Sequence, residues 1–558
     1  MSQIPEMKYI ERIRKLQAHS VAIALEREHS KIIEMILYAI KDITLADGGT
    51  FYTLTEDNKL AFEVFANSTL GTKIGGSSGI PIPYPPLPLH DDEGKPNHSN
   101  IACHCALTAE MVNVQDAYQN SEFNFSGTKA FDARSGYRSQ SVMAIPLKTV
   151  DNKVLGVIQL FNAKDEKGQT TSFHPDDIEM ARFLCTHAAS TLSNFQLNNE
   201  LQQLFVSMAH VLAYAIDNKS PYTGGHCNRV PEVAMMTLQA VIQTTDGPLK
   251  YFSLNEEQIR EMELAALLHD CGKVTTPVHI MDKATKLETI FDRIHLLDTR
   301  FEILKRDAQV EYLQEQMAVI SGQITSDLKE ARKKMMMKMT KYDEDLAFIR
   351  KCNKGTEFMA ESDRARIKEI AAYKLKSSGG GVQSFLTDDE IKNLTIVKGT
   401  LTEEERKVIN DHIVVTLKML GQLKFPANLK NIPEIAGSHH ERIDGKGYPR
   451  GLKGPEMSVQ ARILCLADVF EALTANDRPY KEGKTLQETL FIMGKMVEDG
   501  HLDTDIFQIF LEKKIYLEYA RKYLRPSQYS HLDLAKIPGH RVDNIDITKT
   551  TIEEKKAA

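Results

Sequence analysis

The sequence of 558 residues contains no tryptophan, and aromatic residues make up only 7% of it. Proteins that bind nucleic-acid polymers rely on basic surfaces and, for single strands, on aromatic rings that stack on the bases. A net charge of −7 provides no such basic surface overall, so we expect no nucleic-acid polymer as a partner. Residues 1–198 carry 18 Lys and Arg against 23 Asp and Glu, so most of the excess negative charge lies there.

Cysteines and long apolar runs are also scarce. Seven scattered cysteines are too few for a disulfide framework, and their odd number is typical of reduced thiols. No stretch approaches 18 uncharged apolar residues, and the charged N-terminus lacks the apolar segment of a signal peptide. We therefore expect a cytoplasmic protein that is not inserted in a membrane.

The pattern of apolar residues in the first 198 residues alternates between helix and strand periods. The expected elements are a helix at 8–45, strands at 50–55 and 60–66, a Gly- and Pro-rich loop at 71–100, strands at 141–147 and 154–161, and a helix from Pro175 past Leu201. This order predicts an α/β sandwich built on an antiparallel sheet over residues 1–198, ending in a connecting helix.

From residue 199 onward the pattern is almost entirely helical, which predicts an all-α domain over 199–525. A heptad-like series of apolar residues lies on a charged segment without proline: Ile290, Ile294, Leu297, Phe301, Leu304 and Ala308. We expect an inserted helical hairpin at 288–376 that turns near Asn353-Lys354-Gly355. Residues 526–558 are polar and are expected to form a weakly ordered tail.

Histidines and aspartates gather at helix ends and in apolar runs of the second half. They are His226, His269, Asp270, His412, His439, His440 and Asp468. Imidazole and carboxylate ligands together suit iron, manganese or zinc, and the lack of thiolates argues against a structural zinc site. A carboxylate has two oxygens, so Asp270 can bridge two cations, and two such cations activate water and neutralise a phosphate.

Three separated segments resemble the HD-GYP phosphodiesterases, a branch of the HD metal-dependent phosphohydrolases. They are HDCGK (269–273), HHERIDGKGYP (439–449) and ADVFEALTANDRPYK (467–481). The resemblance implies an all-helical fold that hydrolyses cyclic di-GMP to linear pGpG, and further to GMP. It also implies that the seven histidines and aspartates are metal ligands. Tyr222 stands where members with a third metal have Glu, so we expect two divalent ions, Fe or Mn.

The same resemblance assigns roles around the substrate. Asp270 and Lys273 would be catalytic, with Lys273 on the scissile phosphate. Tyr448 and Pro449 would lie beside the substrate, and Arg478 and Lys481 would contact its phosphates or guanine. Two alternatives stay open: hydrolysis of another cyclic dinucleotide such as cyclic GMP-AMP, and a non-catalytic module that binds a cyclic dinucleotide or docks partner proteins.

Residues 25–198 resemble a GAF domain, a sensory module. The resemblance rests on NVQDAY (113–118), SGYRSQSVMAIPL (135–147), GVIQLFNAKD (156–165) and FHPDD (173–177). It implies a sensor that regulates the phosphodiesterase, with an unknown ligand. The match to members that bind cyclic nucleotides is loose and rests on Asn162, Lys164, Phe173 and Asp177.

Three further features leave alternatives open. Cys103-His104-Cys105 is either a metal, haem or thiol sensor, or a helix with small buried thiols facing a pocket. The inserted hairpin is a dimer contact, a lid, an arm that docks signalling proteins, or a solvated hairpin that packs on itself. The helix at 180–215 joins the two domains, and because such helices commonly pair we expect a parallel homodimer.

Overall fold

The computed structural model describes residues 4–219, 225–355, 358–376, 381–476, 483–529 and 531–540. The chain divides into two compact units, Met1–Phe205 and Val206–Ala558, which are described separately. No helix among the described residues is long and apolar enough to cross a membrane. The domain bounds expected from the sequence, 1–198 and 199–525, stay predictions.

The first unit is built on an antiparallel sheet with the strand order β3-β2-β1-β7-β6-β5. Its strands are β1 (Ala46–Leu54), β2 (Lys59–Asn67), β3 (Thr72–Gly75), β4 (Leu87–Pro88), β5 (Val112–Val114), β6 (Val142–Lys148), β7 (Val154–Lys164) and β8 (Thr170–Thr171). The strands expected at 50–55, 60–66, 141–147 and 154–161 are confirmed, and they form the hairpins β1–β2 and β6–β7. They join where β1 pairs with β7, with Phe51 opposite Ile158.

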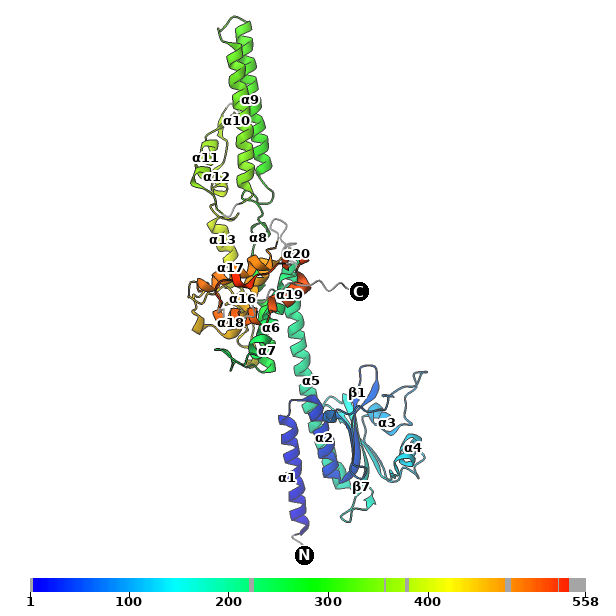
Figure 1. Ribbon diagram of the computed structural model, residues 1–558. Helices are drawn as coiled ribbons and strands as arrows, with labels where there is room; N and C mark the ends of the chain where they lie inside the picture. Colours follow the sequence, from blue (N-terminus) through cyan, green and yellow to red (C-terminus); the bar gives the residue numbers. More distant parts are fainter. Residues whose placement is uncertain are drawn as a thin grey trace. The chain divides into compact units, whose positions relative to one another are not determined.

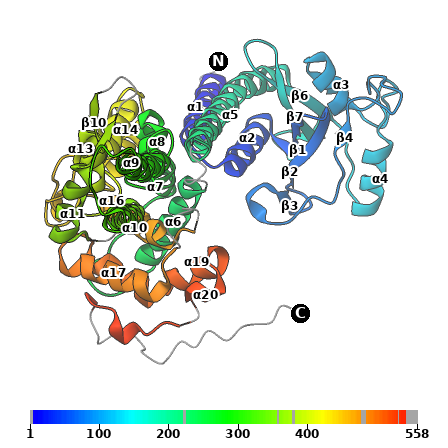
Figure 2. The same cartoon turned by 90° about the horizontal axis from the view of Figure 1, so that it is seen from above.

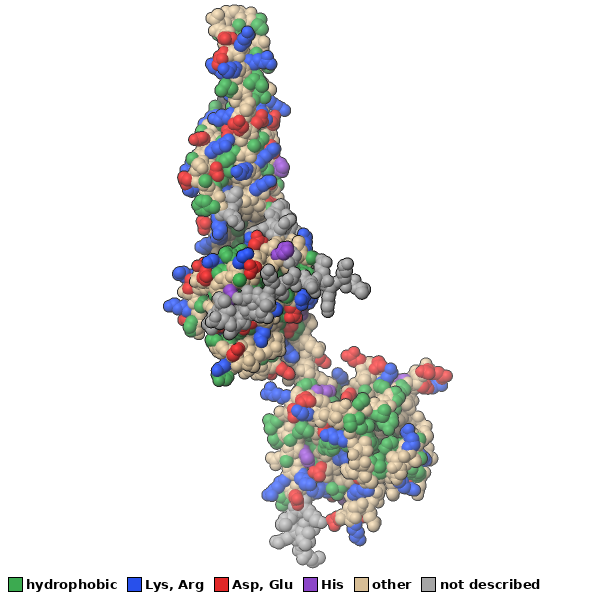
Figure 3. Space-filling model, in the orientation of Figure 1, with side chains coloured by type: hydrophobic (Ala, Val, Ile, Leu, Met, Phe, Trp, Pro, Cys, Tyr) green, Lys and Arg blue, Asp and Glu red, His purple; other side chains and the backbone are tan. Residues whose placement is uncertain are grey.

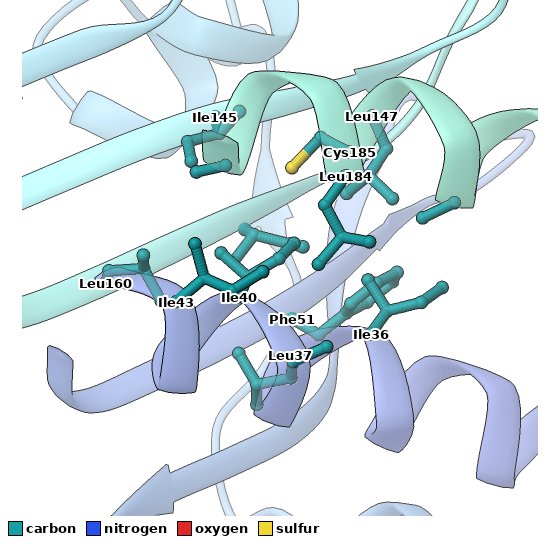
Figure 4. Close-up of a cluster of buried hydrophobic side chains, with 14 of the residues drawn as sticks. Ile36, Leu37, Ile40, Ile43, Phe51, Ile145, Leu147, Leu160, Leu184 and Cys185 are labelled. Atoms are coloured by element: carbon teal, nitrogen blue, oxygen red, sulfur yellow. The ribbon is translucent and has the colours of Figure 1, made fainter. Parts of the chain in front are cut away.

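One face of this sheet is covered by α2 (His29–Thr44) and by α5 (Pro175–Asp217), as Figures 1 and 2 show. Apolar residues of α2 recur every three or four positions, so they form one stripe against the sheet. Figure 4 shows Ile36 and Ile40 of this stripe packed with Phe51 of β1 and Leu184 of α5. The additional helix α1 (Ile4–Leu25) packs on α2, and its Arg12 forms an ion pair with Asp177.

The opposite face carries α3 (Ile101–Thr108) and α4 (Ser126–Ser135) together with the segment at 71–100. That segment, expected as a loop, also contributes β3, the turn η1 (Gly76–Ser78) and β4. Tyr52 and Leu60 of the sheet and Ile101 of α3 belong to a second apolar cluster here. The first unit is thus an α/β sandwich with an apolar core on each side of its sheet.

The second unit is mostly helical, as expected. After the end of α5 its helices are α6 (His226–Ile242), α7 (Glu256–Leu268), α8 (Val278–Met281), α9 (Ile294–Ile320), α10 (Leu328–Asn353), α11 (Glu361–Ala371), α12 (Asp388–Leu394), α13 (Glu403–Asn410), α14 (His412–Gly421), α15 (Ile432–Ala436), α16 (Val459–Thr474), α17 (Leu486–Glu498), α18 (Thr504–Glu512), α19 (Ile515–Tyr523) and α20 (Pro526–Tyr529). Short turns η2 (Cys271–Thr275), η3 (Ala427–Leu429), η4 (Gly454–Glu456) and η5 (Leu534–Lys536) and a small hairpin of β9 (Lys374–Lys376) and β10 (Val382–Ser384) complete it. Near its centre α6 packs against α16 and α7, and α14 packs against η2.

Helices α9 and α10 run side by side as a long hairpin, which we call the arm (Figures 1 and 2). The expected turn near Asn353 is wrong, because the chain reverses between Ile320 and Asp327. Gly322 adopts a positive φ after α9, and the Asp327 side chain caps α10. Basic and acidic side chains are interspersed along the arm in Figure 3, so its visible surface carries no large area of one charge.

The heptad-like series expected on this segment is largely confirmed. Its members from Ile294 to Ala308 are buried along α9, whereas Ile290 precedes the helix and is 93% exposed. Of the expected tail, residues 526–529 and 531–540 are described, and they contain α20 and η5. Gln528 is buried there, and its amide donates hydrogen bonds to the carbonyls of Thr474 and Lys484. Residues 541–558 lie outside the described part.

Candidate metal centre

The HD motif lies where α7 ends. A capping box of Asn255 and Gln258 starts this helix, and its buried apolar residues anchor it in the unit. His269 follows the last helical residue and is fully buried. Its Nδ1 lies 2.6 Å from the carbonyl oxygen of Ala266. Because a carbonyl only accepts hydrogen bonds, Nδ1 carries the proton and Nε2 presents a lone pair.

Gly272 allows α14 to approach this turn closely. A Cβ at Gly272 would lie 2.0 Å from the carbonyl oxygen of His412, so no larger residue fits without a shift. The Thr416 hydroxyl accepts from the amide of Gly272 at 2.9 Å and donates to the carbonyl of His269 at 3.2 Å. The glycine two residues after Asp270 therefore brings the first residue of α14 to the HD turn, although 142 positions separate Asp270 from His412 in the chain.

The same hydrogen-bond arrangement orients two further histidines. His412 donates from Nδ1 to the carbonyl of Ile409, and His439 donates to that of Ala436 at 2.7 Å. Each carbonyl belongs to the residue three positions earlier, at a helix end or turn. All three rings thus have a fixed tautomer, with Nε2 directed to a common space.

Asp270 lies at the middle of this space and is 1% exposed. Its Oδ2 is 3.2 Å from Nε2 of His226 and 3.2 Å from Nε2 of His269. Its Oδ1 is 3.2 Å from Nε2 of His412 and 3.8 Å from Nε2 of His439. The two oxygens of one carboxylate therefore face two different pairs of imidazoles.

Asp468 completes the side of Oδ2, with its Oδ1 3.4 Å from Nε2 of His226. One helical turn further along α16, the buried Glu471 contacts Nδ1 of His226 and accepts from Nε of Arg229 at 2.6 Å. Burial alone would raise the pKa of Glu471, but His226 and Arg229 hold it at about 2. Sequence reasoning missed this carboxylate. The i, i+3 spacing from Asp468 in an apolar helix was the signal that could have found it.

The donor set fits metal ions. Buried side-chain atoms without a hydrogen-bond partner include Nε2 of His269, Nε2 of His412 and Oδ1 of Asp270. Three groups of ligand atoms each lie within 4.8 Å of one another: His412, His439 and His440; His226, His269 and Asp468; and His269, Asp270 and His439. Together these groups contain all seven residues expected from the sequence. Buried polar atoms without partners are costly, so a cation would stabilise this arrangement.

Charge around the cluster is uneven. Burial lowers the pKa of His440 to about 4, so this imidazole is neutral and suited to metal binding at pH 7. The ammonium of Lys273 contacts Oδ2 of Asp270, and its side chain is 22% exposed. Burial disfavours the charged form of Lys273, but Asp270 and Asp468 raise its pKa above the usual value. Lys273 is therefore a positive charge at the rim of the cluster.

The expected substrate-facing residues have different outcomes. Tyr448 stacks on His440 with ring centroids 4.9 Å apart and donates to Oδ1 of Asn410 at 3.3 Å. Pro449 follows it through a cis peptide bond. Arg478 and Lys481, as well as Tyr222, lie outside the described residues.

The first unit holds a separate cavity of about 240 Å³ between its sheet, α3 and α4. Its lining includes several aromatic side chains, among them Tyr52, Phe62 and Phe131. Asn162, Lys164, Phe173 and Asp177 are not among its lining residues. Asn162 instead accepts from the amide of Gln140 and donates to the carbonyl of Arg138, each at 2.7 Å.

The Cys103-His104-Cys105 segment lies on α3, and both thiols are fully buried. Burial raises the pKa of Cys103 to about 11 and raises that of Cys105 as well. A thiol with a raised pKa is a weak metal ligand and a poor nucleophile at neutral pH. These observations favour small buried thiols in a core.

Comparison with known protein families identifies both parts of the chain. Residues 28–192 match the GAF domain, and residues 387–506 match the HD domain. The second match includes His412, His439, His440 and Asp468. His269 and Asp270 of the HD turn lie before this matched range, and the arm separates them from it in the sequence.

Individual known proteins are similar to this chain over 90 to 140 residues. The chain is 36% identical over 140 residues to 3'3'-cGAMP-specific phosphodiesterase 1 of Vibrio cholerae, covering 25% of this chain and 29% of that protein. It is 40% identical over 95 residues to 3'3'-cGAMP-specific phosphodiesterase 3 of the same organism, covering 17% and 20%. It is 42% identical over 90 residues to a cyclic di-GMP phosphodiesterase of Thermotoga maritima, covering 16% and 24%. The chain thus spans less than a third of the length of these relatives.

Proposed function

We propose that this chain, in which a GAF domain precedes an HD domain, is a metal-dependent phosphodiesterase of the HD-GYP type acting on cyclic dinucleotides. One observation carries the proposal. The two oxygens of the buried Asp270 face two separate pairs of imidazoles, and Oδ1 has no hydrogen-bond partner. With these imidazoles, Asp270 would help to hold two cations, which would supply Lewis acidity for phosphodiester hydrolysis. The names of the relatives support the reaction class.

We assign the seven side chains to two divalent cations, Fe or Mn. His226, His269 and Asp468 lie on the side of Oδ2. His412, His439 and His440 lie on the side of Oδ1. Nitrogen and oxygen donors without thiolate suit these metals. When bound, two such ions supply Lewis acidity and an activated water for hydrolysis of a phosphodiester.

The chain's own residues bind and orient the substrate. The Lys273 ammonium contacts Asp270 and offers a positive charge to the scissile phosphate. The bound phosphate would therefore compete with Asp270 for this ammonium. Tyr448 and Pro449 form the loop beside His440 against which the substrate lies. We also propose that Arg478 and Lys481 contact its phosphates or guanine. The products would be linear pGpG and then GMP.

Cyclic di-GMP is the substrate we propose first, with 3'3'-cGAMP as the second candidate. The second candidate is supported by the names of the two Vibrio cholerae relatives. The test is metal analysis of the anaerobically purified chain, followed by parallel cleavage assays on both substrates. If the chain cleaves 3'3'-cGAMP faster than cyclic di-GMP, 3'3'-cGAMP takes the place of cyclic di-GMP as the proposed substrate. Tight binding without cleavage by metal-loaded protein would favour the non-catalytic module.

We also propose a homodimer through α5. Leu197, Leu201, Leu204, Met208 and Val211 are each more than half exposed along this helix. Their alternating spacing of four and three residues is that of a coiled-coil seam. Sedimentation of the wild type and of Leu204→Glu tests this, since a charge in the seam would yield monomers. Regulation by the GAF domain and docking of signalling proteins on the arm remain further proposals.

A further inference from the structure

Two side chains at the C-terminal end of α5 contact two of the turns beside metal-cluster residues, the start of α6 at His226 and the turn η2 after Asp270. Asp217 is the last residue of this helix, and Lys219 follows two positions later. Both lie in the second unit, as do the turns that they contact. The groups that they contact are backbone amides and carbonyls next to cluster residues.

Asp217 holds the start of α6. Its Oδ2 accepts from the amide of Gly225 at 3.0 Å, and its Oδ1 accepts from the amide of Cys227 at 3.2 Å. These are the amides on either side of His226. The first amides of a helix have no partner inside the helix, and Gly225 offers no side chain to cap them. A buried carboxylate from another helix therefore fixes the backbone at His226.

Lys219 holds the turn that follows Asp270. Its ammonium donates to the carbonyls of Lys273 at 3.0 Å and of Thr276 at 2.6 Å, and also to that of Val274. An ammonium has three protons, so all of them are used on carbonyls at the C-terminal end of η2 and at Thr276, the residue that follows it. A cation is favourable at this end of a helical turn because the carbonyl dipoles point toward it.

Asp217 and Lys219 act on the two residues whose ligand atoms form one of the short distances in the cluster. Asp217 fixes the residue that presents Nε2 of His226, and Lys219 fixes the turn that presents Oδ2 of Asp270. These two ligand atoms lie 3.2 Å apart. A metal site needs its ligand atoms held close to their required positions, so His226 and Asp270 would hold a cation only if this distance is kept.

We propose that Asp217 and Lys219 are positioning residues of the metal centre, which set the separation between the His226 turn and the Asp270 turn. The inference rests on the proposed metal-dependent function. It adds a route for regulation, because a displacement of the end of α5 reaches both turns at once.

The test compares variants of the full-length chain. Lys219→Met keeps the apolar stem and removes the three donors, and Lys219→Arg keeps the charge with a different donor geometry. Asp217→Ala removes both acceptors, and Asp217→Asn keeps one. Lys329→Met is the matched control, because Lys329 is exposed on the arm.

Metal affinity is measured by competition with a chelator, and turnover is measured on cyclic di-GMP and 3'3'-cGAMP. We expect Lys219→Met and Asp217→Ala to lower metal affinity and kcat about tenfold or more, with KM little changed. Lys219→Arg and Asp217→Asn should lie between these variants and the wild type, and Lys329→Met should match the wild type. Faster amide exchange at 225–227 and 271–276 should accompany the loss.

Three outcomes would overturn the inference or separate it from the proposed function. Metal affinity within twofold of wild type in both severe variants would overturn it. So would a lower unfolding temperature of the metal-free chain with unchanged affinity in the folded protein, because that marks a purely structural tie. If the wild type binds metal but cleaves neither dinucleotide, the proposed function fails, and metal affinity still decides the positioning role. If a severe variant does not fold, the Arg and Asn variants decide it.

Discussion

Asp132 in the first unit and Asp270 in the second are both almost fully buried carboxylates, yet their surroundings differ. Asp132 accepts from the Tyr118 hydroxyl, from the Ser139 amide and from the Ser139 hydroxyl at 2.7 to 2.9 Å. Oδ1 of Asp270 has no hydrogen-bond partner and faces two imidazole nitrogens. Both carboxylates are buried, but both oxygens of Asp132 accept hydrogen bonds from protein donors, whereas only Oδ2 of Asp270 does so, from Lys273.

The contrast extends to the neighbours of each carboxylate. In the described part of the first unit, buried side-chain atoms without a partner are isolated, on Ser20, Thr53 and His187 of three different elements. In the second unit, such atoms of His269, Asp270 and His412 converge on one space. A protein gains nothing in stability from converging unsatisfied groups. Their convergence indicates a site for a ligand, whereas the network around Asp132 is part of the scaffold.

The largest expected effect is that of Asp270→Ala. Loss of the carboxylate that faces both sets of imidazoles should reduce bound metal to a small fraction and lower turnover by about a thousandfold or more. Circular dichroism should show a folded chain, because the carboxylate has histidines and Lys273 around it rather than a structural network. Metal content by mass spectrometry and cleavage of both dinucleotides check this. Wild-type activity in the variant would refute the assignment of the site.

A smaller loss is expected from Glu471→Gln. The carboxylate accepts from Nδ1 of His226 and from Arg229, so it fixes the ring that faces Asp270. An amide keeps one acceptor oxygen and the shape of the side chain. Metal affinity and kcat should fall about 10- to 100-fold, the usual cost of removing a partner of a ligand. Glu344→Gln on the arm is the control and should change neither quantity.

The sequence predicted local patterns better than long-range contacts. The alternation of apolar residues located both hairpins of the sheet, and adjacent pairs such as His269-Asp270 located the cluster. Glu471, Thr416 and Lys219 were missed because each acts on a residue that lies 54 to 245 positions away in the chain. No pattern within a single element encodes such a contact.

The turn of the arm was predicted wrongly, at Asn353. The weakly ordered tail at 526–558 stays a prediction, although its described part contains α20 and η5. A lack of proline indicates that a segment can be helical, but residues such as Gly322, after the end of α9, and Asp327, at the start of α10, decide where one helix stops and the next begins. Similarly, polar composition did not reveal that Gln528 is buried, because its partners are carbonyls of distant residues.

Asp132→Ala tests the expectation that the buried carboxylate of the first unit is structural and, unlike Asp270, does not affect metal binding. The variant leaves the buried amide and hydroxyl of Ser139 without an acceptor, which should destabilise this unit by about 1 to 3 kcal/mol. Thermal unfolding should show the loss, while metal content and turnover at a temperature where the chain is folded should match the wild type. A drop in metal content equal to that of Asp270→Ala would end the distinction between the two carboxylates.

The smallest effect is expected at Cys103, which tests whether α3 carries a sensor or a core. Burial raises the pKa of this thiol to about 11, above the usual value of about 8.5, so its reactive thiolate is scarce at pH 7. Alkylation of Cys103 in the native chain should be slow and should rise about tenfold per pH unit until the pH nears 11. In the unfolded chain it should level off near pH 9. Peptide mass spectrometry resolves the site, and Cys103→Ala should leave turnover within about twofold of the wild type. Rapid alkylation of native Cys103 at pH 7 would instead favour a thiol sensor, because it requires an exposed thiol with a lowered pKa.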